Sequence, residues 1–344
     1  MSERRFGVLA RVSRGANGGL LCALLGALPL IVACEAELRL DGVAAVEADP
    51  IRRTDQFLAV ESSGSGDVWA FADDGVVLHA TQRSGEQPLS WQRDVLTGAP
   101  NFIGSTTCSD GSVYALSFEN QLWSHSDGQW TQQMVPTEEQ LQVIVCTAKG
   151  DLWAAGAFST LLHSRDRGET WDDASLYEDF TITATAFLPG GVGYAAGEFG
   201  TLLKTSDDGV SWAMLEPIAD DFYPLAAHFS SPDEGWVSGV LGLIFHTKDG
   251  GATWSTQRTA TAASLYGFAQ AKDRLFAFGD LGTLLLYVPS EGAWVDYPSP
   301  QIPVHFADAQ VLGESLLLVG GWGVIAEVPA GSPLEGPQAV GGGH

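Results

Sequence analysis

The sequence predicts an all-β protein, a seven-bladed β-propeller of four-stranded antiparallel blades closed by an N-terminal strand. Self-similar segments recur through the chain, and their closing residues Trp130, Trp171, Trp212, Trp254 and Trp294 follow one another at steps of 40–42 residues. Each segment combines short apolar strands with Gly- and Asp-containing turns and has no helical period. Repeats of about forty residues with this pattern are typical of propeller blades.

The first residues of the chain have the order of an export signal. Four Arg residues precede an apolar run, residues 18–33, that ends at Cys34 and is short for a membrane span. The junction LIVAC resembles the lipidation site of bacterial lipoproteins, so we expect residues 1–33 to be a lipoprotein signal peptide and Cys34 to be lipidated. An ordinary signal peptide or an uncleaved anchor is the alternative. Glu35 favours the outer membrane, facing the periplasm or the cell surface.

Seven units follow a lipid-anchored N-terminal segment, residues 34–55. The clearest three are LWAAGAFSTLLHSRDRGETW (152–171), GYAAGEFGTLLKTSDDGVSW (193–212) and GWVSGVLGLIFHTKDGGATW (235–254). Each contains an aromatic-led strand, a Gly-containing turn, a second apolar strand, an acidic turn and a Trp strand. The seventh unit ends without an outer strand, so we expect residues 37–47 to complete it and remove an open sheet edge. The propeller is predicted over 56–330 and a flexible tail over 331–344.

The acidic turns of three units share the pattern S/T-x-D-x-G-x-S/T-W, known as the Asp-box or BNR repeat. The Asp can accept hydrogen bonds from its own turn, the Gly permits unusual dihedral angles, and the Trp folds back over the hairpin. Because the motif recurs in several blades, we assign it a structural role rather than a catalytic one. Its residues are Ser164, Asp166, Gly168 and Trp171; Thr205, Asp207, Gly209 and Trp212; and Thr247, Asp249, Gly251 and Trp254.

These motifs, together with the signal sequence and the seven units, resemble the photosystem II stability/assembly factor family over about residues 56–328. The passage 235–254 carries the strongest resemblance. Members of that family are lumenal or periplasmic propellers that help membrane complexes to assemble, which implies a binding or assembly role here. Photosynthetic members present an arginine-rich patch, whereas this chain has a formal net charge of −25. The resemblance therefore does not extend to the photosystem as partner.

Asp-boxes also occur in sialidases, so a glycan-binding protein or a sialidase-like glycoside hydrolase is one alternative. Such a site needs three convergent arginines, a Tyr–Glu nucleophile pair and an Asp acid. Arg165 and Arg167 lie inside an Asp-box turn, while Arg39, Arg52 and Arg53 lie before the first unit. We therefore predict no catalytic residues and no enzyme activity.

Metal, cofactor and nucleic-acid binding are not expected. His79, His163 and His246 fall on one repeated strand position in different blades and so do not converge on one ion. The acidic turns lack the ligand spacing of a calcium loop, and no phosphate-binding motif is present. The acidic charge disfavours nucleic acid and anionic lipid, so the membrane is contacted through the lipid anchor only. Cys108 and Cys146 can form a disulfide or remain two buried thiols.

The turn after the aromatic-led strand offers a candidate binding surface. Its third position is polar in the first two units, Asp74 and Glu119, and apolar in the next five: Phe158, Phe199, Leu241, Leu281 and Trp322. Either these side chains pack between blades, or they form an exposed docking arc whose acidic surround suits a basic or apolar protein partner.

The function we predict is therefore a monomeric, exported, non-enzymatic propeller that acts as a binding or assembly factor for an envelope or membrane protein complex. An accessory role for a membrane transporter is the other alternative.

Overall fold

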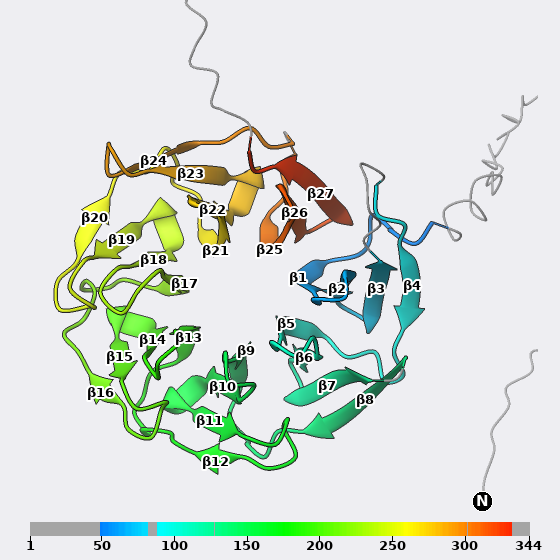
Figure 1. Cartoon of the computed structure of the whole chain (residues 1–344), viewed down its shortest axis with the longest axis horizontal. Coiled ribbons are helices and arrows are strands. Elements are labelled where there is room, and N and C mark those ends of the chain that lie inside the picture. The colour runs from blue at the N-terminus through cyan, green and yellow to red at the C-terminus, as the bar shows by residue number, and fades with distance from the viewer. Residues whose placement is uncertain (1–48, 82–87, 127, 301, 332–344) are drawn as a thin grey trace, which may run out of the picture. The chain divides into compact units, whose positions relative to one another are not determined.

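A computed structural model describes residues 49–81, 88–126, 128–300 and 302–331. The chain divides into two units, Met1–Ala44 and Ala45–His344, and the first lies outside the described residues. Cys34 and the predicted closing strand, residues 37–47, lie outside them as well. The lipid anchor and the closure of blade 7 by this strand therefore stay predictions. Within the second unit, the predicted seven-bladed propeller is confirmed, and Figure 1 shows its seven sheets around a central opening.

Six blades have four antiparallel strands in simple up-and-down order, and the seventh has three strands among the described residues. Blades 1 to 3 contain β1 (Phe57–Ser62), β2 (Asp67–Ala72), β3 (Val76–Thr81), β4 (Gln92–Val95), β5 (Phe102–Thr107), β6 (Val113–Ser117), β7 (Gln121–Ser126), β8 (Gln129–Met134), β9 (Leu141–Cys146), β10 (Leu152–Gly156), η1 (Ala157–Ser159), β11 (Leu161–Ser164) and β12 (Asp172–Asp173). Blades 4 and 5 contain β13 (Ile182–Phe187), β14 (Gly193–Gly197), η2 (Glu198–Gly200), β15 (Leu202–Thr205), β16 (Ala213–Met214), β17 (Pro224–Phe229), β18 (Gly235–Gly239), η3 (Val240–Gly242), β19 (Ile244–Thr247) and β20 (Ser255–Gln257). Blades 6 and 7 contain β21 (Leu265–Ala271), β22 (Arg274–Gly279), η4 (Asp280–Gly282), β23 (Leu284–Val288), β24 (Ala293–Asp296), β25 (Phe306–Leu312), β26 (Ser315–Gly320) and β27 (Val324–Pro329).

The apolar core lies between neighbouring blades. Every residue of the second strand is buried in most blades, because its alternate side chains face the blades on either side. Between blades 1 and 2, for example, Phe71 packs edge-on against Phe102 at 5.3 Å. Each blade thus depends on two neighbours, which is the usual source of stability in a ring of sheets.

Blade 7 packs against blade 1 and closes the ring. Phe57 and Val60 of β1 share one core cluster with Leu317 and Val319 of β26. The backbone N–H of Val60 also donates to Asp308 Oδ2 of β25 at 2.9 Å. This seam joins the two ends of the propeller without any covalent connection between them.

A disulfide joins Cys108, just after β5, to Cys146 at the end of β9, with their Cα atoms 5.2 Å apart. The sequence left this pairing open. The bond cross-links blades 2 and 3 through their innermost strands.

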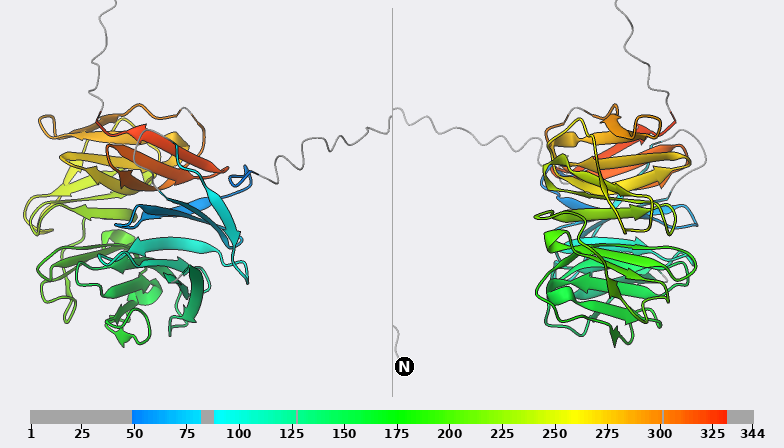
Figure 2. Two further views of the ribbon diagram at one scale, coloured as in Figure 1. Left: turned by 45° about the vertical axis from the view of Figure 1, so that its right-hand side comes forward. Right: turned by 90° about the vertical axis from the view of Figure 1, so that its left-hand side faces the viewer.

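The two faces of the ring are built from different segments. Because strands alternate in direction, the turn between the second and third strands lies at the same end of a blade as the connection to the next blade. We call this end of the ring the turn face, and the short helical turns of neighbouring blades lie on it (Figure 2, right). The Asp-box turns lie on the opposite face, which we call the Asp-box face. The described helical segments are three residues long, and none could span a membrane.

Candidate functional site

Five apolar side chains stand at equivalent turns of blades 3 to 7, and we call them the apolar arc. In each turn two successive residues have positive φ, for example Phe199 at φ 62° followed by Gly200 at φ 70°. Glycine at the second position has a steric reason: a Cβ on Gly200 would lie 2.3 Å from the carbonyl oxygen of Ala219. The first position points away from the connection. It holds Phe158, Phe199, Leu241, Leu281 and Trp322.

The side chains of the apolar arc are exposed rather than packed between blades. Their exposed fractions are 53% for Phe158, 65% for Phe199, 70% for Leu241, 68% for Leu281 and 54% for Trp322. A left-handed backbone is a rare choice for bulky residues and costs about 1–2 kcal/mol for each. These residues therefore combine an unfavourable backbone conformation with little burial, so the stability of the fold does not account for their type.

Three further aromatic residues of the turn face were missed in the sequence. Phe118 stands in the β6–β7 turn one position before Glu119 and is 56% exposed, while Tyr177 and Tyr223 lie in connections and are 76% and 37% exposed. Tyr177 also has positive φ, 58°, and its hydroxyl donates to Asp173 at 2.6 Å. An aromatic residue in every connection between blades 3 and 5 was the available signal, but the connections differ in length and do not align.

The Asp-boxes form closed hydrogen-bond networks. In the first box, Asp166 accepts from Ser164 Oγ at 2.8 Å and from Thr170 N at 2.8 Å, and Gly168 N donates to Ser164 Oγ at 2.7 Å. The other two boxes repeat these bonds, and hydrogen bonds from Thr253 lower the pKa of Asp249 to about 2. These carboxylates are thus committed to their own turns.

The boxes also contact the preceding blade. A Cβ on Gly209 of blade 4 would lie 2.2 Å from Trp153 Cζ2 of blade 3, and Gly209 has φ +80°. A box therefore serves as a spacer between blades.

Each of the three repeated histidines belongs to its own blade. His163 stacks on Trp153 at 4.2 Å and its Nε2 lies 3.1 Å from Asp151, and His246 makes the same contacts with Trp236 and Glu234. Burial lowers the pKa of both imidazoles. In the described ranges no three His, Cys, Asp or Glu side chains are placed to hold one metal ion.

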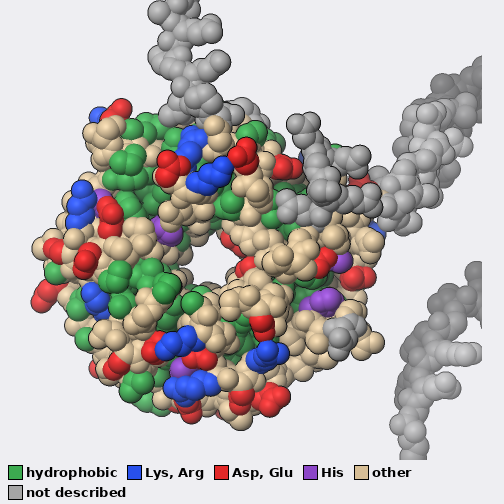
Figure 3. All heavy atoms as spheres, viewed as in Figure 1, with side chains coloured by type: hydrophobic (Ala, Val, Ile, Leu, Met, Phe, Trp, Pro, Cys, Tyr) green, Lys and Arg blue, Asp and Glu red, His purple; other side chains and the backbone are tan. Residues whose placement is uncertain are grey.

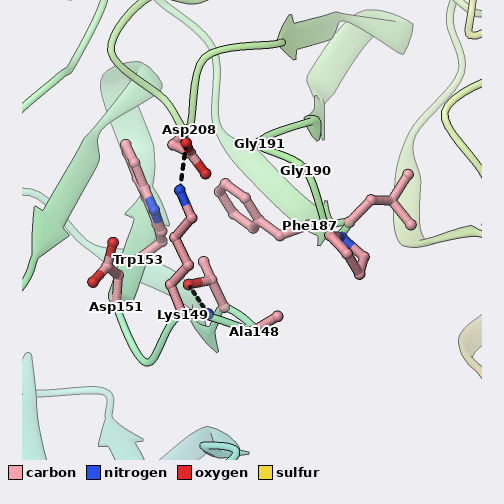
Figure 4. A pocket seen from close by; sticks show the side chains of 11 residues that line it. Ala148, Lys149, Asp151, Trp153, Phe187, Gly190, Gly191 and Asp208 are labelled. Carbon is pink, nitrogen blue, oxygen red and sulfur yellow. Dashed lines mark hydrogen bonds and ion pairs between the residues drawn. The ribbon is translucent and has the colours of Figure 1, made fainter.

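A hollow of about 210 Å³ lies on the Asp-box face between blades 3 and 4. Figure 4 shows Trp153 and Phe187 on either side of Lys149, whose Nζ pairs with Asp208 at 2.6 Å. The volume of this hollow is below the ~300–1,000 Å³ typical of small-molecule sites. The exposed ion pair contributes little binding energy.

The arginines of the described segments are dispersed. Arg93 pairs with buried Asp55 at 2.8 Å, Arg167 with Asp110 at 2.8 Å, and Arg165 with Asp172. In Figure 3, which looks onto the Asp-box face, blue Lys and Arg side chains lie beside red Asp and Glu side chains around the ring. The three convergent arginines of a sialidase-like site do not occur among these described residues.

The fold and its Asp-boxes define a BNR-type β-propeller. The family model of the photosynthesis system II assembly factor YCF48 matches residues 177–271, which confirms the resemblance read from the sequence over that part of the propeller. No curated protein sequence matches the chain.

Solved structures share the fold at low identity. YCF48 from Cyanidioschyzon merolae is 13% identical with a TM-score of 0.64, covering 80% of this chain and 95% of the other. YCF48 bound to D1 peptide has the same identity and TM-score, with coverage of 80% and 91%. Virginiamycin B lyase from Staphylococcus aureus is 14% identical with a TM-score of 0.67, covering 78% and 92%. The same fold therefore occurs in an assembly factor and in an enzyme.

Proposed function

We propose that the chain is a non-enzymatic propeller that binds a protein partner through the turn face and acts as an assembly factor for an envelope or membrane protein complex. The observation that carries this proposal is the apolar arc, in which five successive blades expose a bulky side chain on a left-handed backbone. Exposed apolar side chains that gather on one face are typical of interaction sites. The family match and the D1 peptide bound to YCF48 support a polypeptide as ligand.

The fold alone does not decide against catalysis, because virginiamycin B lyase has the same fold. The arrangement of side chains argues for binding. The apolar arc has no nucleophile with an adjacent base, and the carboxylates of the Asp-boxes are occupied within their own turns.

The test is affinity capture from the native envelope with the Phe158→Ser/Phe199→Ser variant. We expect it to lose the partner captured by the wild type while its melting temperature stays within a few degrees, because both side chains are more than half exposed. Val210→Ser/Met214→Ser is the matched control, since Val210 and Met214 are 77% and 54% exposed outside the arc. Retained capture by a stable arc variant would contradict the proposal.

We further propose that the protein is exported and anchored as a monomer through lipidated Cys34, at the outer membrane, facing the periplasm or the cell surface. The support is the sequence LIVAC after an Arg-flanked apolar run. Cys34→Ser should release the protein from the membrane fraction or block its processing. An unchanged membrane fraction with an unchanged N-terminal mass would refute the anchor.

A further inference from the structure

Acidic side chains alternate with the aromatic residues of the turn face across blades 2 to 5. The connection between blades 3 and 4 carries Glu178 and Asp179, both exposed. Leu176 N and Phe180 O of this connection bond to Ser159, next to Phe158, and Thr181 O accepts from Glu198 N, next to Phe199. The two carboxylates therefore lie between the Phe158 turn and the Phe199 turn.

The neighbouring connections repeat this order. Asp220 and Asp221 lie between Ile218, whose N–H donates to Gly200 O beside Phe199, and Tyr223, whose O accepts from Val240 N beside Leu241. Glu138 and Glu139 occupy the connection between the Phe118 turn and the Phe158 turn, where Asn120 Nδ2 donates to Glu139 O and Gln140 O accepts from Ala157 N. Apolar side chains and carboxylate pairs thus alternate once per blade.

Positive charge is missing from this part of the surface. The turns and connections of the turn face between Leu96 and Leu243, which belong to blades 1 to 5, contain no Lys and no Arg. Arg258 begins the next connection, directly after β20, and pairs with Glu291 of the β23–β24 turn on the other face. None of the six carboxylates is in an ion pair within the described part of the chain.

The cations near the same blades lie instead on the Asp-box face, where most are paired. Lys149 pairs with Asp208, Arg167 with Asp110, and Arg165 with Asp172. The ring therefore has one face where charges of both signs neighbour each other and another where carboxylates stand alone between apolar side chains.

We propose that the partner of the turn face is a polypeptide segment in which apolar side chains alternate with Lys or Arg, laid across blades 2 to 5. This inference rests on the proposed protein-binding function and specifies the chemistry of its partner. The apolar side chains of the segment contact Phe118, Phe158, Phe199 and Leu241, and its cations meet the carboxylate pairs between them. Charge complementarity of this kind fixes register and speeds association more than it tightens binding.

The acidic surface also selects against other ligands. Unpaired carboxylates repel an acidic segment, and an uncharged apolar segment would leave them facing apolar groups without partners. Because exposed charges are screened beyond about 8 Å at 0.15 M salt, the preference should weaken as salt rises.

The experiment uses synthetic amphipathic peptides as probes with the propeller protein, measured by fluorescence anisotropy. Three peptides share one alternation of polar and apolar positions. The Lys peptide has Lys at every polar position, and the Glu peptide has Glu there. The third peptide keeps the Lys residues and has Ser in place of the apolar residues. We expect the Lys peptide to bind at least tenfold more tightly than either of the other two, and 0.5 M NaCl to reduce this difference.

Charge variants locate the site. Glu178→Gln/Asp220→Asn should weaken binding of the Lys peptide about fivefold, the effect of two exposed charge contacts. Glu169→Gln/Asp233→Asn on the Asp-box face removes the same charge and should leave binding unchanged, which separates local contacts from the attraction of a basic peptide to an acidic protein.

The outcomes distinguish this inference from the function on which it rests. Equal binding of Lys and Glu peptides, both lost in Phe158→Ser/Phe199→Ser, would overturn the basic partner and keep the apolar arc as a binding site. Unchanged peptide binding by Phe158→Ser/Phe199→Ser would overturn the site itself. An equal loss of affinity in the charge variants of the turn face and of the Asp-box face would do the same.

Discussion

Glu61 gives the protein a predictable response to pH. Its carboxyl group lies on β1, the first strand of blade 1, and accepts hydrogen bonds across the interface with blade 2 from Thr107 Oγ1 at 2.8 Å and Ser105 Oγ at 3.1 Å. Burial is the largest cause that raises its pKa, to about 8, and the neighbouring carboxylate of Asp308 raises it further. Burial likewise raises the pKa of Asp308 to about 6.

The sign of the effect follows from linkage. A carboxyl whose pKa is higher in the folded than in the unfolded state makes the folded state bind the proton more tightly. The stability gained from Glu61 is therefore complete below pH 4.5, falls as pH rises, and is lost by about pH 8. A shift from 4.5 to about 8 corresponds to about 5 kcal/mol, and the partial solvent exposure of Glu61 lowers this to about 2–4 kcal/mol.

The perturbation is Glu61→Gln, because the amide keeps the shape and both hydrogen-bond partners but cannot ionise. We expect the free energy of unfolding in urea to fall between pH 6 and pH 9 in the wild type and to stay nearly level in the variant, with the variant more stable by about 2–4 kcal/mol at pH 9. Glu327→Gln, an exposed acid on β27, is the control. Parallel pH profiles for wild type and Glu61→Gln would refute the reasoning.

Three further perturbations test the architecture. Cys108→Ala/Cys146→Ala should lower the free energy of unfolding in urea by about 4 kcal/mol, since the bond closes a loop of 38 residues. A wild-type unfolding midpoint that is the same under oxidising and reducing conditions would contradict this. Gly209→Ala should cost at least about 2 kcal/mol because φ is +80° and the new Cβ meets Trp153, whereas Gly190→Ala, at φ +96° with nothing within 4 Å, isolates the backbone contribution. A mature chain that starts at Asp55 should melt at lower temperature than one that keeps residues 37–47, and equal melting would mean that another strand closes blade 7.

The fold could be predicted because it depends on a repeat. The period of the Trp residues, the Gly-containing turn and the Asp-box each recur, so one blade could be checked against the next. The inner strands are less regular. Glu61 pairs with Trp69 across its blade, while Val145 and His228 occupy the matching positions beside Trp153 and Trp236. A single ionisable residue in a variable strand position carries no signal of its unusual environment.

The candidate site was only partly readable from the sequence. The five positions of the apolar arc followed from the turn pattern, but their exposure depends on where neighbouring connections run, and the sequence does not give those paths. Tyr177 and Tyr223 were missed for the same reason. The disulfide also needed coordinates, because equivalent ends of neighbouring strands can lie within or beyond bonding distance.

The turn of blade 1 shows what the fold itself requires. Asp74 has φ 53° at the position that Phe158 and Phe199 occupy with φ 51° and 62°. Asp tolerates this conformation well and Phe does not, so a polar residue would satisfy the same turn at lower cost. The following position is constrained, since a Cβ on Gly75 or Gly200 would strike the adjoining connection. The second position is therefore restricted, and the seven blades have glycine there except for Asn120 and Ser159. The first position is not restricted in this way, and it carries the five exposed apolar side chains. We propose that contact with a partner is the reason for these residues, because folding does not require them.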